Sequence, residues 1–479
     1  MSLKLKWANR MRRLGIIGLL FAFCGSAQAV DTALYHRTYV HAPVNTPVKR
    51  AITFQGDFFR YSFASGSNVL PFSMVGKMSV GGYISSDVTA DVESRLKGNN
   101  RAGIHQQFSL VVYPLRSRVD GWGAKMESGK GQKDKVVLQT ISVRTVQTAG
   151  AKFSDDAYRL AFRGNGYYRG RTLEVGENHF QFLGYNAVDF RFRTDLSQRG
   201  AFDVSVLQGT SFSRLQTANM SLFTSASGDS LAFNGRYFNQ GTGSQGWGQR
   251  GMGLSVGFTR LLTFRGLGGE KRRENTHYLR VGVRDLGFLY MPRVSVQSRG
   301  YVWDASMRGL SVAGESPIKT VSLKQAVVNA KELQLSNWFG NQRDSATSRL
   351  QLQDQTRSGT VLVPFTLFAE LLNLNIKGQN FGLSANYLHV PGYRISNRLW
   401  WNKLLLPKGE QKWTSLNLQP YLATGGFDTY DLGMAVDFET PIKRMGKTFF
   451  RLDLRGLEAW AMPNKQHGAG LSAAMIFHL

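Results

Sequence analysis

Short segments in which apolar and polar residues alternate recur along the chain. Residues 188–193, 432–438 and 450–455 each carry an apolar side chain at every second position, with charged or small residues between. Residues 158–163 alternate in the same way, with Tyr158, Leu160 and Phe162 on one side. Successive residues of a strand face opposite sides of a sheet, so each segment predicts a strand with one apolar and one polar face.

Such strands suit either a soluble sandwich or a barrel that spans an outer membrane. Three features favour the barrel. The alternating segments are numerous, glycine (52 residues) and aromatic residues (12%) are plentiful, and the chain ends on a further alternating segment at residues 471–479. A helical membrane protein is not expected, because no apolar run after residue 29 reaches about 18 residues.

We therefore predict an all-β fold, a single transmembrane antiparallel β-barrel formed by residues 51–479. We expect about 14 strands, within a range of about 12 to 16. Residues 30–50 are predicted to be an N-terminal periplasmic or plug segment. A long polar loop or plug segment is expected around residues 310–358, where alternation stops and residues 322–325 match a helix capping box.

The first 29 residues resemble a secretory signal peptide. Basic residues precede an apolar run at residues 14–23, and residues 27–29 (Ala-Gln-Ala) fit a cleavage site. We expect the mature chain to begin at Val30 and to reside in the outer membrane of a Gram-negative bacterium. The single cysteine, Cys24, lies inside this leader, so the mature chain would have no disulfide and no thiolate-bound metal.

The net charge of +27 raises the question of an anionic partner. The densest basic run is only residues 271–273, so no nucleic-acid partner is expected. We interpret the charge as spread over loops and a water-filled lumen. The expected partners are outer-membrane lipid, proteins that contact the loops and a small-molecule solute of unknown identity; no cofactor and no metal are expected.

One catalytic pattern occurs in the chain. Residues 253–257 (Gly-Leu-Ser-Val-Gly) match the nucleophile elbow of hydrolases, which requires a strand-to-helix turn. Here the match lies inside an alternating segment with no helix signal after it, so we attribute it to chance. We predict no catalytic residues and no enzyme activity.

The charged faces of two predicted strands are the candidate lumen-lining residues. A charged side chain on the lipid face costs roughly 2–4 kcal/mol near the midplane, so these residues should face inward and their apolar neighbours outward. They would bias the lumen toward anions, or they would pair across strands and fill a narrow interior. The six candidates are Asp189, Arg191, Arg193, Arg451, Asp453 and Arg455.

A resemblance to a known family rests on residues 279–289 and 301–303, and on residues 45–47 and 96–99 near the start. These stretches are similar to a family of Bacteroidota outer-membrane β-barrel proteins of no assigned activity, related to FadL-like and PorP-like barrels. The resemblance implies a strand that ends in Asp-Leu-Gly-Phe at residues 285–288, followed by a short returning strand. It also implies either uptake of a hydrophobic solute or a place in an envelope assembly.

The predicted function is passive, porin-like transport of a small solute, hydrophobic or anionic, across the outer membrane. The alternative is a non-transporting structural or accessory barrel of an envelope or secretion assembly. A second alternative is an outer-membrane enzyme such as a lipase, which would need an acid/base pair near the membrane rim.

Overall fold

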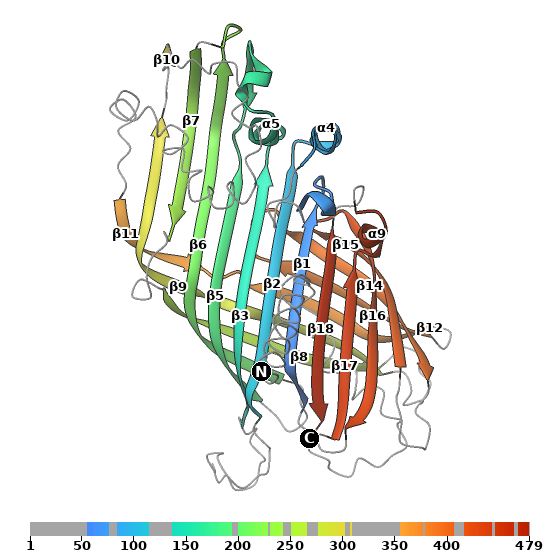
Figure 1. Ribbon diagram of the computed structural model, residues 1–479. Coiled ribbons are helices and arrows are strands. Elements are labelled where there is room, and N and C mark those ends of the chain that lie inside the picture. Colours follow the sequence, from blue (N-terminus) through green and yellow to red (C-terminus); the bar gives the residue numbers. More distant parts are fainter. Residues whose placement is uncertain are drawn as a thin grey trace, which may run out of the picture.

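The alternating segments form a closed barrel in the computed structural model (Figure 1). The structure describes residues 55–75, 84–114, 137–193, 200–228, 230–242, 251–265, 276–301, 307–308, 355–376, 379–406, 416–442, 446–463 and 468–478. These residues form one antiparallel sheet in which β18 (Ala469–His478) pairs with β1 (Gln55–Ser67) and closes the ring.

The remaining strand segments follow one another around the sheet. Their bounds are β2 Asn100–Pro114, β3 Val137–Phe153, β4 Arg171–Glu174, β5 His179–Arg193, β6 Gly200–Thr224, β7 Ser230–Gly241, β8 Met252–Arg265, β9 Thr276–Tyr301, β10 Met307–Arg308, β11 Gln355–Leu362, β12 Thr366–Ile376, β13 Gln379–Leu388, β14 Arg394–Leu406, β15 Leu416–Gly426, β16 Tyr430–Ile442 and β17 Gly446–Arg455.

Several of these segments are consecutive parts of one barrel strand. β4 and β5 both pair with β6, and β7 and β8 both lie between β6 and β9. β11 and β12 both pair with β9, and β10 extends β9 along β7. Counted in this way, the barrel is closed and antiparallel with 14 strands, which confirms the predicted fold class and strand number.

The predicted strands at residues 188–193, 432–438 and 450–455 lie within β5, β16 and β17, as expected. The last alternating segment forms most of β18. In each case the apolar and polar faces are separated by the pleat of the strand, because neighbouring residues point to opposite sides.

The predicted strand at residues 158–163 is wrong, because these residues belong to helix α5 (Asp155–Arg163). Ser154 caps this helix by accepting a hydrogen bond from the backbone N–H of Ala157 (3.2 Å). Asp155 and Asp156 occupy the first turn, where acidic residues favour a helix, and Gly164 follows with φ 73°. Six alternating residues are too few to outweigh these helix-terminus signals.

The resemblance implied a strand end at residues 285–288, and this expectation is also wrong. β9 continues through this point to Tyr301 and is 26 residues long. These residues form a β-bulge instead: Asp285 has φ 58°, and the register with β8 shifts between Val256 and Phe258.

Several helices cluster at one end of the barrel, which we call the helical end (Figure 1). They are α4 (Ser86–Arg95), α5, the 3₁₀ helix η1 (Asn165–Tyr168) and α9 (Leu457–Ala461). The start of β1 and the end of β18 lie at the opposite end, because Gln55 pairs with His478.

None of the helices in the described part of the chain is long and apolar enough to cross a membrane.

Several predictions fall outside the described residues. These are the signal peptide at 1–29, the segment at 30–50 and the capping box at 322–325. The polar stretch predicted at 310–358 is described only from residue 355, where β11 begins.

Candidate lumen site

The two faces of β8 show how the barrel wall is built. Met252, Leu254, Val256 and Phe258 point outward and are 42–55% exposed, whereas Ser255 on the other face is buried. The neighbouring strand β9 continues the apolar outer face directly alongside, with Leu286, Phe288 and Tyr290 paired to the outward residues of β8. The barrel therefore presents apolar side chains outward and polar side chains inward at this part of the wall.

Three of the six candidates, Arg451, Asp453 and Arg455 on β17, are buried on the inner face. Arg455 contacts two carboxylates, Asp431 (2.5 Å) and Asp428 (2.9 Å). The outward neighbours Phe450 and Leu452 are 37% and 41% exposed. The charged face of β17 thus lies inside the barrel and is held by ion pairs.

Asp453 is the centre of this group. It accepts hydrogen bonds from Arg398 (3.0 Å) and from the hydroxyl of Tyr421 (2.9 Å), and Arg451 lies 3.8 Å away. Arg451 also reaches Asp437 (3.3 Å). We call these residues of β14–β17 the paired wall, because each arginine named here has a carboxylate partner.

Asp189 and Arg191 on β5 belong to a different part of the interior. Asp189 forms an ion pair with Arg144 of β3, whose Nη2 lies 3.0 Å from the carboxylate, and Arg191 lies 3.6 Å from Asp203 of β6. The sixth candidate, Arg193, is the last residue of β5, and its side chain is outside the described residues. The structure therefore places five of the six candidates, in two separate groups with separate partners.

A cavity of about 120 Å³ lies where Asp189 and Arg191 meet residues of β1, β2, β3, β6 and β9. Sequence reasoning missed most of the residues that line it. The lining comprises Arg60, His105, Gln107, Ser109, Val111, Thr140, Ser142, Arg144, Asp189, Arg191, Asp203, Ser205, Gly257, Arg284, Asp285, Pro364 and Thr366.

The bulge in β9 places two consecutive charged residues at this cavity. Asp285 adopts the left-handed conformation, and both it and Arg284 line the cavity opposite Gly257 of β8. The carboxylate of Asp285 accepts two hydrogen bonds from Arg144, at 2.7 and 2.5 Å. In a regular strand these neighbours would face opposite sides, so only the bulge brings both inward.

Two arginines on β9 have different surroundings although they are four residues apart. Arg280 is 1% exposed and forms an ion pair with Glu370 of β12, with its Nε 2.8 Å from the carboxylate. Arg284 has no hydrogen bond or ion pair to any described residue and lies 5.4 Å from the ring centroid of Phe368. The first arginine is part of the packed wall, and the second faces the cavity.

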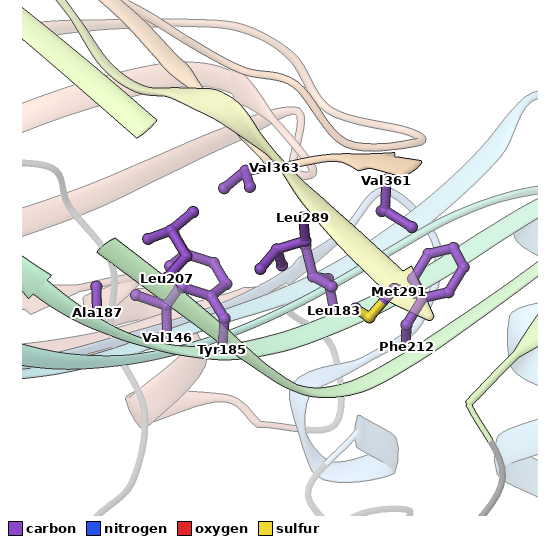
Figure 2. Packing of buried hydrophobic residues seen from close by; sticks show 10 residues of the cluster. All are labelled: Val146, Leu183, Tyr185, Ala187, Leu207, Phe212, Leu289, Met291, Val361 and Val363. Carbon is purple, nitrogen blue, oxygen red and sulfur yellow. The ribbon is translucent and has the colours of Figure 1, made fainter. Parts of the chain in front are cut away.

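On the helical-end side of the cavity the interior is apolar. Figure 2 shows ten packed residues from β3, β5, β6, β9 and the segment around β11, including Tyr185, Leu207 and Leu289. Leu289 and Met291 follow Asp285 along β9, so this cluster lies beyond the cavity toward the helical end. Its members are at most 5% exposed, so the cluster packs closely on this side of the barrel interior.

Two turns at the helical end fold across the interior. Residues 427–429, between β15 and β16, contact β2: Arg101 donates to the backbone oxygens of Phe427 (3.0 Å) and Asp428 (2.7 Å). The ring of Phe427 packs on Gly103, where an added Cβ would lie 1.9 Å from it. Since β2 and β15 are not neighbours in the sheet, this turn folds inward over the strands that lie between them.

The second turn, residues 389–393 between β13 and β14, meets β3. The backbone oxygen of Pro391 packs against Gly150, and Tyr393 contacts Phe427 edge-on at 5.1 Å. Together the two turns, which we call the inward turns, occupy the interior at the helical end.

Asp428 is the buried acid of the inward turns. It accepts a hydrogen bond from the backbone N–H of Ser67 (2.7 Å) and shares Arg455 with Asp431. Burial raises the pKa of Asp428 to about 7; the charge of Arg455 opposes this rise and Asp431 adds to it. One guanidinium serves two carboxylates here, so the fold favours a proton on Asp428.

The hydrolase-like pattern at residues 253–257 lies within β8, with strands on both sides. Ser255 is buried, and its hydroxyl has no hydrogen-bond partner in the described structure. Among the described residues, no group of three His, Cys, Asp or Glu side chains could hold a metal ion.

No family model matches the chain, and no curated protein matches it. Among solved structures, the chain is similar to the transport unit of the autotransporter AIDA-I from Escherichia coli, with 8% identity, 93% of this chain and 95% of that chain covered, and a TM-score of 0.24. The translocator domain of autotransporter NalP from Neisseria meningitidis gives 8% identity, 88% and 89% coverage, and a TM-score of 0.24. A TodX monoaromatic hydrocarbon channel mutant gives 8% identity, 88% and 90% coverage, and a TM-score of 0.32.

Proposed function

We propose that the protein spans an outer membrane as a barrel and passes a small polar or anionic solute through a lumen that the inward turns gate. The observation that carries the membrane assignment is the outer face. Successive outward residues of β8 and β9 are large, apolar and about half exposed, and they pair into one continuous surface. Such a surface is costly in water, whereas lipid matches it.

A membrane protein must also pair its backbone polar groups in addition to presenting an apolar outer face, and a closed barrel does so. Backbone N–H and C=O groups must be paired in lipid, and the pairing of β18 with β1 leaves no open sheet edge. The proposal includes two expectations from the sequence. The chain is expected to be related to FadL-like and PorP-like barrels, and its first 29 residues are expected to be a signal peptide.

The inner face supports a role for the lumen. It carries charged side chains on β1, β3, β5, β9 and β17, and it encloses a cavity lined mainly by polar groups. Fixed charge inside a lumen selects permeant ions by sign. We propose that the protein passes its solute through the lumen without catalysing a reaction.

The second candidate is a non-transporting accessory barrel. It is favoured by the way in which the apolar cluster and the inward turns fill the interior near the helical end. A scaffold can be filled with side chains throughout, whereas a transporter needs these turns to move.

Conductance in planar bilayers separates the two candidates. Phe427→Ala removes the ring that packs on Gly103, so it should raise conductance if the inward turns gate the lumen. Tyr430→Ala is the matched control, because Tyr430 follows the same turn but is 52% exposed. If neither the native protein nor Phe427→Ala conducts or releases solute from vesicles, the accessory role is favoured.

Membrane insertion is tested separately by carbonate washing and by heat-modifiable migration in gels. We expect the native protein to stay with the membrane pellet and to migrate faster before boiling. Recovery as a soluble periplasmic protein would contradict the proposal.

A further inference from the structure

The cavity contains more positive than negative groups. Four arginines line it, against three aspartates; they are Arg60, Arg144, Arg191, Arg284 and Asp189, Asp203, Asp285. Within the described residues, the three carboxylates do not form ion pairs with all four arginines. The arginine that has no carboxylate partner there indicates where a ligand would bind.

Arg144 takes two of the three carboxylates. Its guanidinium donates to Asp189 at 3.1 and 3.0 Å and to Asp285 at 2.7 and 2.5 Å. The third, Asp203, lies 3.6 Å from Arg191. No carboxylate within the described residues forms an ion pair with Arg284, although the negative charge of Asp203 acts on it from farther away.

Arg284 is also surrounded by like charge. Arg60, Arg191 and Arg280 all act on it repulsively, and its guanidinium lies among side chains rather than in open solvent. Desolvation and repulsion both disfavour a cation that lacks a counter-ion. An anion in the cavity would offset both effects.

The rest of the lining fits an oxyanion. The hydroxyls of Ser109, Thr140 and Ser142 line the same space and can donate hydrogen bonds. A planar guanidinium matches the two oxygens of a carboxylate in a bidentate geometry. The volume of about 120 Å³ has room for several water molecules, or for one carboxylate in their place.

We propose that this cavity is a binding site for a small organic acid carrying one negative charge, with Arg284 as its main contact and Arg60 and Arg191 beside it. The inference deepens the proposed function and rests on it in one respect: the site would select the solute that the lumen passes. Binding itself needs only the folded barrel.

The test uses the full-length protein folded in detergent micelles and ¹³C-labelled acetate as the probe, followed by NMR line broadening. We expect saturable binding of acetate and none of acetamide, which has the same shape without the charge. Acetate should also raise the unfolding temperature, and acetamide should not. If neither compound binds, or both bind alike, the proposal is wrong.

Two substitutions locate the site. Arg284→Gln should weaken acetate binding about tenfold or more, corresponding to the loss of about 1.4 kcal/mol. Arg260→Gln removes the same charge from an exposed position on β8 away from the cavity, and it should leave binding unchanged. Equal loss in both variants would assign binding to net charge and overturn the proposal.

A third variant covers the case in which Arg284→Gln does not fold. Arg284→Lys keeps the charge without the planar fork, so it should bind acetate more weakly than the native protein does. Unchanged binding in this variant would contradict the role of Arg284. The comparison of acetate with acetamide tests anion binding on the native protein and needs no variant.

These measurements are independent of transport. If acetate binds but bilayers show no conductance, the site exists in a non-transporting barrel and only the proposed function fails. If the barrel conducts but acetate does not bind, only this inference fails.

Discussion

The paired wall and the residues that line the cavity, which we call the cavity wall, both contain arginines and aspartates, yet they are organised differently. On β14–β17, Arg398, Arg451 and Arg455 each meet a carboxylate, and the side chains pack closely. At the cavity, Arg284 meets none among the described residues. The difference teaches that charge inside a barrel has two uses: paired charge fills space and fixes the strands, and unpaired charge leaves a place for a ligand.

The largest expected effect concerns the centre of the paired wall. Asp453→Asn removes the negative charge that Arg398 and Arg451 share, so the charge of these two buried cations is compensated less well, although Arg451 keeps its contact with Asp437. We expect a loss of about 4 kcal/mol in the free energy of unfolding, measured by urea titration in lipid vesicles. Asp437→Asn, at a more exposed pair, should cost clearly less. Equal and small effects of both substitutions would mean that the paired wall is not held by its charges.

A second prediction compares the two arginines of β9. Arg280→Gln leaves Glu370 buried without its partner, so it should lower the free energy of unfolding by about 3 kcal/mol in the same assay. Glu370→Gln combined with Arg280→Gln should recover part of this loss, because the pair is then neutral. If the double variant is no more stable than the single one, the ion pair is not the cause.

In the inward turns, the contribution of a buried charge to stability should depend on pH. The folded-state pKa of Asp428 is about 7 and its unfolded value is about 4, so the folded protein holds a proton that the unfolded chain has released between these values. The contribution of Asp428 to stability should therefore fall as pH rises from about 4 to 7, by roughly 1–3 kcal/mol.

Asp428→Asn should flatten this part of the stability profile, since Asn does not titrate but can still accept from Ser67. Urea titrations of both proteins at a series of pH values measure the difference between them. A native profile with the same slope as that of the variant would show that Asp428 is ionised in the fold throughout this range.

The smallest expected effect on stability belongs to the cavity wall. Arg284→Gln removes a cation that has no ion pair with a described residue, so it should change the free energy of unfolding by less than about 1 kcal/mol, or raise it. A loss as large as that of Arg280→Gln would remove the distinction between the two walls.

The sequence predicted the barrel well because alternation is a local property. In residues 188–193 of β5, 432–438 of β16 and 450–455 of β17, every second residue is apolar, and a strand is the conformation that separates such a pattern into two faces. It failed at residues 158–163, where six alternating residues form α5. There the capping residue Ser154 and the acidic first turn outweigh the pattern.

The candidate site could be predicted only in part. Asp189 and Arg191 were identified from the alternation of β5, and they do line the cavity. Arg284 and Asp285 were not identified, because adjacent residues of a regular strand face opposite sides and only the bulge in β9 turns both inward. The positive φ of Asp285 gives no signal in the alternation.

The sequence by itself determined that the chain forms amphipathic strands and, from their number and length, about how many strands the barrel contains. It also determined which face of each regular strand is polar. Only the tertiary structure decided which charges meet. Arg144 contacts both Asp189 and Asp285, the second of which is 141 positions away in the sequence, and the turn at Asp428 folds inward to reach β1 and β2. Alternation is set by neighbours along one strand, whereas the pairing of charges depends on the closure and register of the whole barrel.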